Sequence, residues 1–268
     1  EKTLRGIVQI DNTQKEGVSL YYCEDYFNYF FGVMPVTTAY TDVFDVIKYG
    51  DGFLVRYPSA EKPNELTNYK SNKKLLSTLE EYEDIHRVLQ IDTLYKLNKE
   101  IKEGRTSNVI LLSEALHEKK MANIADDIAK RKNVKMVLIA GPSSSGKTTF
   151  AKRLGVELRL NGLKPVTISV DNYFVERVDN PKDENGDYDF ECLEAIDLEL
   201  FNNHIKTLLD GGTIDVPTFD FKVGTKRYNG EKMHLADDEI LVIEGIHCLN
   251  DKLTSSIPME QKYKIYIS

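Results

Sequence analysis

The run Gly141-Pro142-Ser143-Ser144-Ser145-Gly146-Lys147-Thr148 decides the fold of the carboxy-terminal half of this chain. It follows a short apolar stretch, residues 134–140, and opens a helical stretch, residues 147–160, that stops at Asn161-Gly162. Gly-x-x-x-x-Gly-Lys-Thr between a strand and a helix is the pattern of a phosphate-binding loop. Its glycines permit a tight turn, and its backbone N–H groups and the helix dipole attract an anion. The sequence therefore predicts a nucleotide site here.

The residue types in this loop indicate what each would do. We expect Lys147 to contact the β- and γ-phosphates of ATP, and the Thr148 hydroxyl to ligate Mg²⁺. A chance match in a Gly-rich turn is the alternative, but the place of the motif between a strand and a helix argues against it. The predicted ATP-binding residues are Gly141, Ser143, Ser144, Ser145, Gly146, Lys147, Thr148 and Thr149.

Strand-like and helical patterns alternate after the loop. Apolar runs at residues 165–170, 214–217, 240–243 and 263–267 predict strands, and residues 193–209 predict a helix. Alternating β and α segments imply a parallel sheet covered on both faces. The fold class predicted for residues 126–268 is therefore α/β, a P-loop domain with a doubly wound parallel sheet.

The first 125 residues predict a smaller α+β domain. Aromatic and β-branched runs at 6–10, 18–22 and 52–58 are typical of strands, whereas 75–85, 94–101 and 107–131 have helical spacing. Because the chain begins with Glu1, not methionine, and ends directly after a strand-like run, we expect sequence to be missing at both ends.

Composition limits the class of protein. Three widely spaced cysteines argue against a zinc site or a disulfide framework, and no apolar run approaches the length of a membrane span. A formal charge of −8 opposes attraction to nucleic acid and to anionic membranes. We expect a cytoplasmic protein that binds a small anionic ligand. The sequence leaves its oligomeric state open, a homo-oligomer included.

Two carboxylates end predicted strands, where ligands of such sheets collect. Asp171 follows the run 166–170 and Glu244 follows 240–243. Phosphoryl transfer needs oxygen ligands for the metal and an acceptor for the proton of the attacking hydroxyl. We predict Asp171 as that base, with Lys147 as its catalytic partner, and Thr148, Glu244 and Asp171 on the metal side. The alternative for either carboxylate is a helix or turn cap.

Five motifs in order resemble the uridine kinase and phosphoribulokinase family. They are the loop Gly141–Phe150, Ser169-Val170-Asp171-Asn172-Tyr173-Phe174, Tyr188-Asp189-Phe190 with Ala195-Ile196-Asp197, Val216-Pro217-Thr218-Phe219-Asp220-Phe221, and Ile243-Glu244-Gly245-Ile246. The resemblance covers residues 134–268. It implies transfer of the ATP γ-phosphate to a hydroxyl of a nucleoside, sugar or related small molecule. It also implies that Asp171 accepts the hydroxyl proton and Asp189 binds ribose hydroxyls.

The chain departs from this family at the acceptor. The family reads a pyrimidine with Tyr and His where this chain has Phe219 and Gly224, so uridine is not assumed as the substrate. Lys222, Lys226 and Arg227 lie in a predicted hairpin that could hold an anionic acceptor, and a solvated hairpin face is the alternative. The predicted acceptor residues are Asp189, Tyr173, Phe219, Lys226 and Arg227.

The amino-terminal half bears a looser resemblance. Residues 26–32 and 112–120 are similar to bacterial nucleoside-kinase-like proteins, which carry a TGS-like region and a domain similar to the second amino-terminal domain of threonyl-tRNA synthetase. Without a His-x-x-x-His pair, editing chemistry is not expected. A second hypothesis therefore stays open beside the kinase: a nucleotide-dependent regulatory module that contacts RNA or protein. In the family an arginine-bearing lid follows the last strand, so we expect these residues alone to catalyse poorly.

Overall fold

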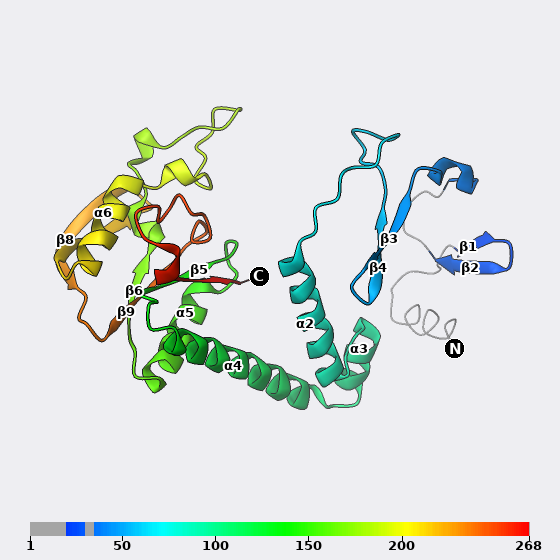
Figure 1. Ribbon diagram of the computed structural model, residues 1–268, viewed down its shortest axis with the longest axis horizontal. Coiled ribbons are helices and arrows are strands. Elements are labelled where there is room, and N and C mark those ends of the chain that lie inside the picture. The colour runs from blue at the N-terminus through cyan, green and yellow to red at the C-terminus, as the bar shows by residue number, and fades with distance from the viewer. Residues whose placement is uncertain (1–19, 30–34, 268) are drawn as a thin grey trace. The chain divides into compact units, whose positions relative to one another are not determined.

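The computed structural model describes residues 20–29 and 35–267 (Figure 1). The chain divides into two compact units, Glu1–Ser113 and Glu114–Ser268. The predicted boundary, 125/126, lies inside helix α4 (Thr106–Lys130). The carboxy-terminal part of α4 belongs to the second unit because Met121, Ala125 and Ile128 are buried in its core.

The described part of the first unit holds two antiparallel hairpins and two further helices. The predicted strand at 6–10 lies outside the described residues, and the aromatic run at 26–32 lies partly outside them. Both predicted helices are present after the hairpins. The elements are β1 (Leu20–Cys23), β2 (Tyr26–Tyr29), the 3₁₀ turn η1 (Thr38–Thr41), β3 (Asp45–Tyr49), β4 (Gly52–Arg56), α2 (Lys73–Leu89) and α3 (Leu94–Lys102).

A four-stranded parallel sheet forms the centre of the second unit, in the order β10-β5-β9-β6. Its strands are β5 (Met136–Ala140), β6 (Lys164–Ser169), β9 (Glu239–Glu244) and β10 (Lys262–Tyr266). Every residue of β5 is buried, as expected for a strand covered on both faces. The doubly wound parallel sheet predicted from the alternating pattern is confirmed.

Alternate side chains of the central strands enter two separate cores. Val137 and Ile139 pack on α4 and α5 (Lys147–Leu160), whereas Met136 and Leu138 face the core that contains α6 (Leu198–Leu209). In Figure 1, α4 and α5 lie below the strands of the sheet, and α6 lies to their upper left. The period of two along β5 thus places helices on both faces of the sheet.

One predicted strand of the parallel sheet lies elsewhere. Residues 214–217 belong to β7 (Thr213–Asp220), which pairs antiparallel with β8 (Thr225–His234) in a separate hairpin. The physical reason is visible in its burial: buried and exposed residues alternate along β7, the pattern of a strand with one solvated face. The prediction that Lys222, Lys226 and Arg227 share a hairpin is confirmed.

The predicted helix 193–209 begins later than expected. Residues Leu193–Ala195 form the 3₁₀ turn η4, and α6 begins only after Asp197, its N-cap. Ile196 between them pairs with Phe174, so the chain is extended at that point. Three further 3₁₀ turns complete the unit: η2 (Val170–Tyr173), η3 (Arg177–Asp179) and η5 (Met259–Gln261).

Asp197 joins α6 to the hairpin. Its Oδ1 accepts a hydrogen bond from Leu200 N at 3.0 Å, and its Oδ2 is paired with Lys226 Nζ at 2.7 Å. Burial opposes ionisation of Asp197, but the hydrogen bonds from Lys226 and from the Leu200 N–H outweigh it and lower the pKa. Asp197 is therefore both a helix cap and an anchor for β8.

We expect Asp197→Ala to lower the free energy of unfolding by about 1 kcal/mol or more, since it removes the cap and leaves Lys226 unpaired. Because the folded pKa lies below the unfolded one, this stability is present above the unfolded pKa and lost as pH falls through the folded value. Urea unfolding at neutral and acidic pH measures the effect. The control is Asn203→Ala, because Asn203 is exposed on the same helix and its side chain caps nothing in the described part of the chain. Equal losses for both variants would contradict the assignment.

Candidate functional site

The carboxyl ends of three neighbouring parallel strands lie level with one another. Glu244, the last residue of β9, pairs in register with Ile139 of β5 and with Ser169 of β6. The residues that follow these strands are the phosphate-loop candidate after β5, Asp171 after β6 and Glu244 itself. The topology thus brings together the three features that the sequence analysis placed at strand ends.

The loop from Gly141 to Gly146 has the backbone of an anion-binding turn. Ser144 and Gly146 adopt left-handed conformations with φ of 62° and 85°, and Gly146 precedes the first turn of α5. At Gly141 a Cβ atom would lie 2.7 Å from Ser145 Oγ and would also collide with the Ile267 carbonyl of the neighbouring strand end. Only glycine fits there, because the loop passes so close to the strand.

Three polar side chains in and just after the loop have the chemistry to bind an anionic ligand with a metal ion. Lys147 Nζ donates to the carbonyl oxygens of Gly141 and Pro142 at 3.1 and 3.0 Å, so its charge is held beside the loop. The buried Ser145 Oγ has no hydrogen-bond partner among the described residues. Thr148 Oγ1 donates to Glu244 Oε1 at 3.2 Å, which places an alcohol and a carboxylate oxygen together at the start of α5. Ser143, Ser144 and Thr149 are exposed around them.

Asp171 lies in η2 beside this loop. Its side chain reaches solvent, yet the surrounding protein desolvates it and the nearby Glu244 carboxylate adds repulsion, so the pKa of Asp171 is raised. Lys147 and His247 oppose this shift in the pKa. The chain therefore gathers two carboxylates, one ammonium group and one imidazole at one edge of the sheet.

A testable consequence is the pH dependence of stability. Because the folded-state pKa of Asp171 lies above its ordinary value of 3.8, the neutral carboxyl favours the fold at low pH, and that stabilisation is lost as pH rises through the folded pKa. Asp171→Asn should therefore raise the melting temperature relative to the wild type more at about pH 8 than at about pH 4. Thermal unfolding of both proteins without ligands measures this. A difference in melting temperature that is independent of pH would contradict the environment described for Asp171.

His247 is a site residue that the sequence analysis missed. It lies in the loop after β9, three residues beyond Glu244, and its buried Nε2 has no hydrogen-bond partner among the described residues. Its position just past a strand end was the available signal. The predicted motif ends at Ile246, one residue before His247.

The predicted acceptor residues are only partly brought together. Asp189 is half-buried, and its Oδ1 accepts hydrogen bonds from Glu191 N and Cys192 N at 2.9 and 3.1 Å. Phe219 is 6% exposed and stacks with Phe174 and Phe221, with ring centroids 5.5 and 5.0 Å apart. We call Phe174, Tyr188, Phe190, Phe219 and Phe221 the aromatic cluster.

Tyr173, predicted as an acceptor residue, does not reach the surface of the site. Its side chain is fully buried, its hydroxyl is hydrogen-bonded to His204 Nδ1 at 3.1 Å, and its ring packs edge-on against Phe201. Burial raises the pKa of the Tyr173 phenol. In the short turn η2, Asp171 is exposed and Tyr173 is buried in the core, so Tyr173 supports the turn from inside.

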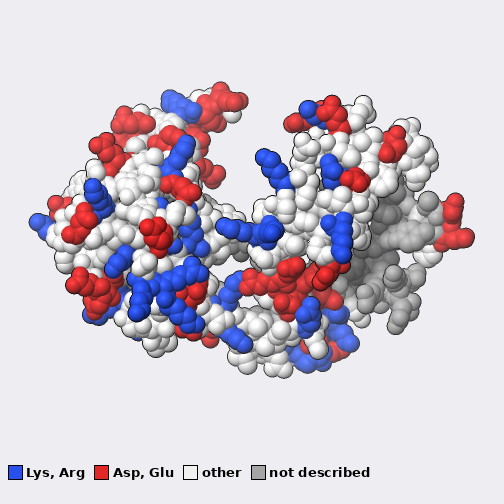
Figure 2. Space-filling view, in the orientation of Figure 1, with Lys and Arg blue, Asp and Glu red and all other residues white. Residues whose placement is uncertain are grey.

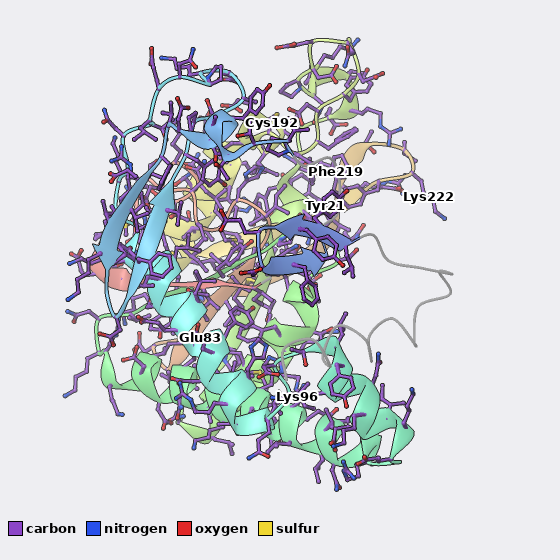
Figure 3. The ribbon with its side chains drawn as sticks, turned by 90° about the vertical axis from the view of Figure 1, so that its right-hand side faces the viewer. Tyr21, Glu83, Lys96, Cys192, Phe219 and Lys222 are labelled. Atoms are coloured by element: carbon purple, nitrogen blue, oxygen red, sulfur yellow. The ribbon has the colours of Figure 1, made fainter. Side chains whose placement is uncertain are left out.

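Two of the three cations predicted to hold an anion are paired with carboxylates of the protein. Lys226 is paired with Asp197, and Arg227 Nη2 lies 3.1 Å from Asp220 Oδ2. Lys222 stands at the hairpin tip, where Figure 3 shows it pointing away from Phe219 and from the domain. The hairpin therefore presents neutralised charges to its surroundings at Lys226 and Arg227.

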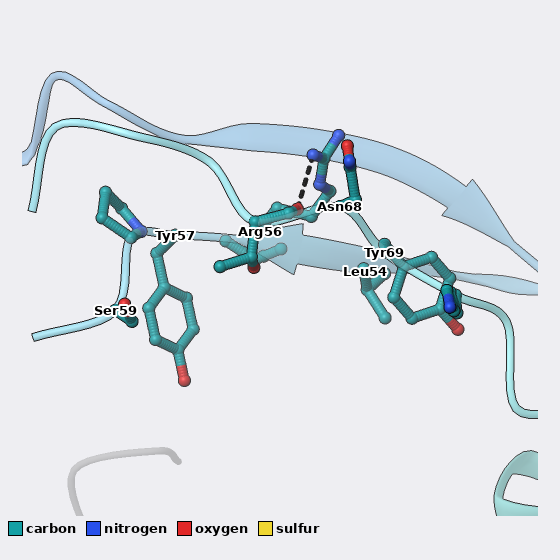
Figure 4. Close-up of a pocket in the computed structure, with 10 residues that line it drawn as sticks. Leu54, Arg56, Tyr57, Ser59, Asn68 and Tyr69 are labelled. Atoms are coloured by element: carbon teal, nitrogen blue, oxygen red, sulfur yellow. Dashed lines mark hydrogen bonds between the residues drawn. The ribbon is translucent and has the colours of Figure 1, made fainter. Parts of the chain in front are cut away.

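Two hollows of about 420 and 590 Å³ lie in the first unit and contain no residue of this site. The smaller is lined by residues 54–59 and 67–70 (Figure 4). There Arg56 Nη2 donates to the Thr67 carbonyl at 2.8 Å and Nη1 pairs with Asp45 Oδ2, so the arginine joins β4 to the following segment. Neither hollow gathers catalytic groups, whereas the strand ends of the second unit do.

The residues present fit a nucleotide phosphate with Mg²⁺. The unpartnered Ser145 Oγ, the close approach at Gly141 and the oxygen pair of Thr148 and Glu244 match the ligands that phosphates and Mg²⁺ require. Within the described residues there is no cluster of three or more His, Cys, Asp or Glu side chains able to hold a metal by themselves. A metal here would share its ligands with phosphate oxygens.

Comparison with known proteins defines the class of this domain. Residues 136–267 match the model of the Phosphoribulokinase / Uridine kinase family. This part of the chain is similar to that family and has a fold like that of P-loop kinases, in agreement with the resemblance drawn from the sequence. Among the described residues no helix has the length and apolarity that crossing a bilayer would require.

Individual relatives cover the same half of the chain. The uridine kinase of Ligilactobacillus salivarius is 31% identical over 125 residues, 46% of this chain and 57% of that protein. The uridine kinase of Halobacterium salinarum is 29% identical over 119 residues, 44% of this chain and 51% of its own. This chain therefore spans little more than half the length of these relatives. The structure titled a possible uridine kinase from Bacillus stearothermophilus matches with a TM-score of 0.42 and 21% identity, over 55% of this chain and 80% of that one.

Proposed function

We propose that this protein is an ATP-dependent kinase that transfers the γ-phosphate of ATP to a hydroxyl group of a small molecule in the cytoplasm. The observation that carries the proposal is the meeting of Lys147, Thr148, Asp171 and Glu244 at adjoining strand ends, with Thr148 and Glu244 joined by a hydrogen bond of 3.2 Å. The match to the Phosphoribulokinase / Uridine kinase family over residues 136–267 supports it.

In the proposed reaction each group has one task. The loop amides and Lys147 hold the phosphates and stabilise the charge that develops on their oxygens. Asp171 takes the proton of the acceptor hydroxyl while the hydroxyl oxygen forms a bond to the γ-phosphorus and the bond to the ADP oxygen breaks. A raised pKa suits this role, because the carboxylate that accepts the proton becomes a stronger base. Thr148 and Glu244 would hold Mg²⁺, which supplies positive charge to the phosphates.

The acceptor is a small molecule in this proposal, and charge supports that choice. The net charge of the chain is −8, and Figure 2 shows acidic and basic side chains interspersed over the visible face of the second unit. A mixed surface of this kind does not attract the phosphate backbone of a nucleic acid over long range. Asp189, with Oδ1 fixed by two backbone N–H groups, is our candidate for binding acceptor hydroxyls.

For the amino-terminal region we propose the arrangement that the looser resemblance implies, a domain similar to the second amino-terminal domain of threonyl-tRNA synthetase over residues 1–125, downstream of a TGS-like region. The proposed role of such a region is to bind a partner of the kinase domain, not to catalyse.

The test is a screen of the full-length protein with ATP and Mg²⁺ against nucleosides, sugars, sugar phosphates, hydroxy acids and other polyols. We expect ADP formation that depends on one class of acceptor and that is lost in the Asp171→Asn variant. Acceptor-independent ADP formation, or none above the level of Asp171→Asn, would overturn the kinase proposal. It would favour a nucleotide-dependent regulatory module.

A further inference from the structure

Residues 174–190 and 219–227, which carry the aromatic cluster, include five cations, and four of them are accounted for. Lys226 and Arg227 are paired with carboxylates, Lys222 points outward from the hairpin tip, and Lys182 Nζ lies over the ring of Tyr188, 5.1 Å from its centroid. The fifth is Arg177 in η3, which is half-buried. It has neither a carboxylate nor an aromatic partner among the described residues.

Arg177 lies in a space that Gly224 leaves open. Gly224 is at the hairpin tip with φ of +81°, and a Cβ built on it would lie 2.6 Å from Arg177 Nε and 3.0 Å from Cζ. No side chain can occupy position 224 while the guanidinium is there. The sequence predicts Gly224 only as the loss of a residue that reads the base. In the structure, Gly224 makes room for an arginine from another segment.

The backbone around Arg177 is fixed to the same hairpin tip. Arg177 N donates to the Gly224 carbonyl at 2.9 Å, and the backbone N of Lys226 donates to Glu176 Oε1 at 3.0 Å. Arg177 Nη2 donates to the Phe221 carbonyl at 2.5 Å. The guanidinium is thus held in place through one of its five N–H groups, and the structure records no protein acceptor for the other four among the described residues.

The segment that carries Arg177 begins at the proposed base. Asp171 is in η2, Phe174 enters the aromatic cluster, and Arg177 follows three residues later against Phe221 of the same cluster. A molecule with its reacting hydroxyl at Asp171 and its body along the aromatic cluster would therefore meet Arg177 at the far end. A guanidinium with free, pre-positioned N–H groups suits a carboxylate or a phosphate, because two oxygens of either group can accept its parallel N–H groups.

We propose that Arg177 is the specificity-determining residue for the acceptor and that it binds an oxyanion of that molecule, a carboxylate or a phosphate. This inference rests on the proposed kinase function and names the acceptor class: a hydroxyl compound that already carries one acidic group. The sequence analysis predicted that Lys226 and Arg227 hold the anion, but these two cations neutralise Asp197 and Asp220. The proposal assigns anion binding to Arg177, which is not paired with a carboxylate among the described residues.

The test uses the full-length protein with ATP, Mg²⁺ and matched acceptors that differ by one acidic group. Glycerol against glycerate probes a carboxylate, and ribose against ribose 5-phosphate probes a phosphate. We expect the acidic member of one pair to give the larger kcat/KM. Arg177→Ala should then raise the KM of that acceptor about ten- to a hundredfold, the effect of losing hydrogen bonds to a charged group, with little change in kcat or in the KM of ATP.

Three further variants separate binding from structural support. Gly224→Ala retains the arginine, but its Cβ would lie 2.6 Å from Arg177 Nε and 2.7 Å from Arg177 Cβ at a φ of +81°, so it should displace Arg177 and raise the KM of the acidic acceptor as Arg177→Ala does, with a loss of stability that thermal unfolding measures. Arg177→Lys keeps the charge without the fork and should restore part of the affinity. The control is Lys232→Ala, because Lys232 is an exposed cation on β8 of the same hairpin and has no role in the proposed site; this variant should leave the KM unchanged.

The possible results are distinguishable. Acceptor-dependent ADP formation that favours the uncharged members would overturn the inference and leave the kinase proposal standing. The inference would also be overturned if Arg177→Ala raised the KM of charged and uncharged acceptors by the same factor. That result would mean that Arg177 only supports the hairpin. No acceptor-dependent ADP formation with any compound would count against the kinase function itself, and the inference would fall with it.

Discussion

Replacing Lys147 with alanine should lower the rate of ATP-dependent phosphoryl transfer by about a hundred- to a thousandfold, the range measured when a preorganised charge-stabilising group is removed. Lys147 Nζ is held at 3.1 and 3.0 Å from the carbonyl oxygens of Gly141 and Pro142 in a loop that otherwise offers backbone N–H groups. Without it the charge of the triphosphate would be compensated only by the loop dipoles and Mg²⁺. ATP affinity should weaken about tenfold or more, since a hydrogen bond to a charged group is lost.

Initial rates of ADP formation and calorimetric titration with ATP measure both effects. Lys152→Ala is the matched control, because Lys152 lies on the same helix, α5, but is exposed and makes no recorded contact with the loop. Its rate and ATP affinity should equal those of the wild type. If Lys147→Ala bound ATP as tightly as the wild type, the assignment of the loop would be wrong.

Replacing Asp171 with asparagine should lower kcat by about a hundred- to ten-thousandfold while ATP affinity stays within a few-fold of the wild type, because general-base catalysis contributes on that order. Asparagine keeps the size and polarity of the side chain but cannot accept the hydroxyl proton. As a protein without Asp171 still has Lys147, Thr148 and Glu244, nucleotide binding should survive.

Asp179→Asn is the control for that variant, since Asp179 is an exposed carboxylate on the neighbouring turn η3. It should retain wild-type kcat. An Asp171→Asn protein that is as active as wild type would show that Asp171 plays no chemical part.

The features predicted from sequence are those fixed by local spacing. A continuous apolar run before the Gly-rich loop predicted β5. A second continuous apolar run predicted β9, with Glu244 at its end. Both strands are buried on two faces, so their residues are apolar without interruption. Such a run predicts a central strand of a parallel sheet directly. The register of Glu244 with Ile139 and Ser169 then follows from the parallel sheet.

The features that local spacing could not predict depend on contacts between distant segments. The apolar residues of β7 indicated a strand but not its partner, so it was assigned to the parallel sheet and not to the hairpin with β8. The motif around Asp171 predicted Tyr173 as an acceptor residue, but Tyr173 is buried against α6. The space that Gly224 leaves for Arg177 exists only once η3 meets the hairpin.

The central claim is that Lys147, Thr148, Asp171 and Glu244 form one phosphoryl-transfer site. Its most direct test is to follow the labelled γ-phosphate of ATP in the full-length protein and ask whether the label appears on an acceptor hydroxyl, for the wild type and for Asp171→Asn. The account predicts labelled acceptor in amounts equal to the ADP formed by the wild type, and at least about a hundredfold less in the variant. Label released only as inorganic phosphate, or transferred equally by both proteins, would contradict it.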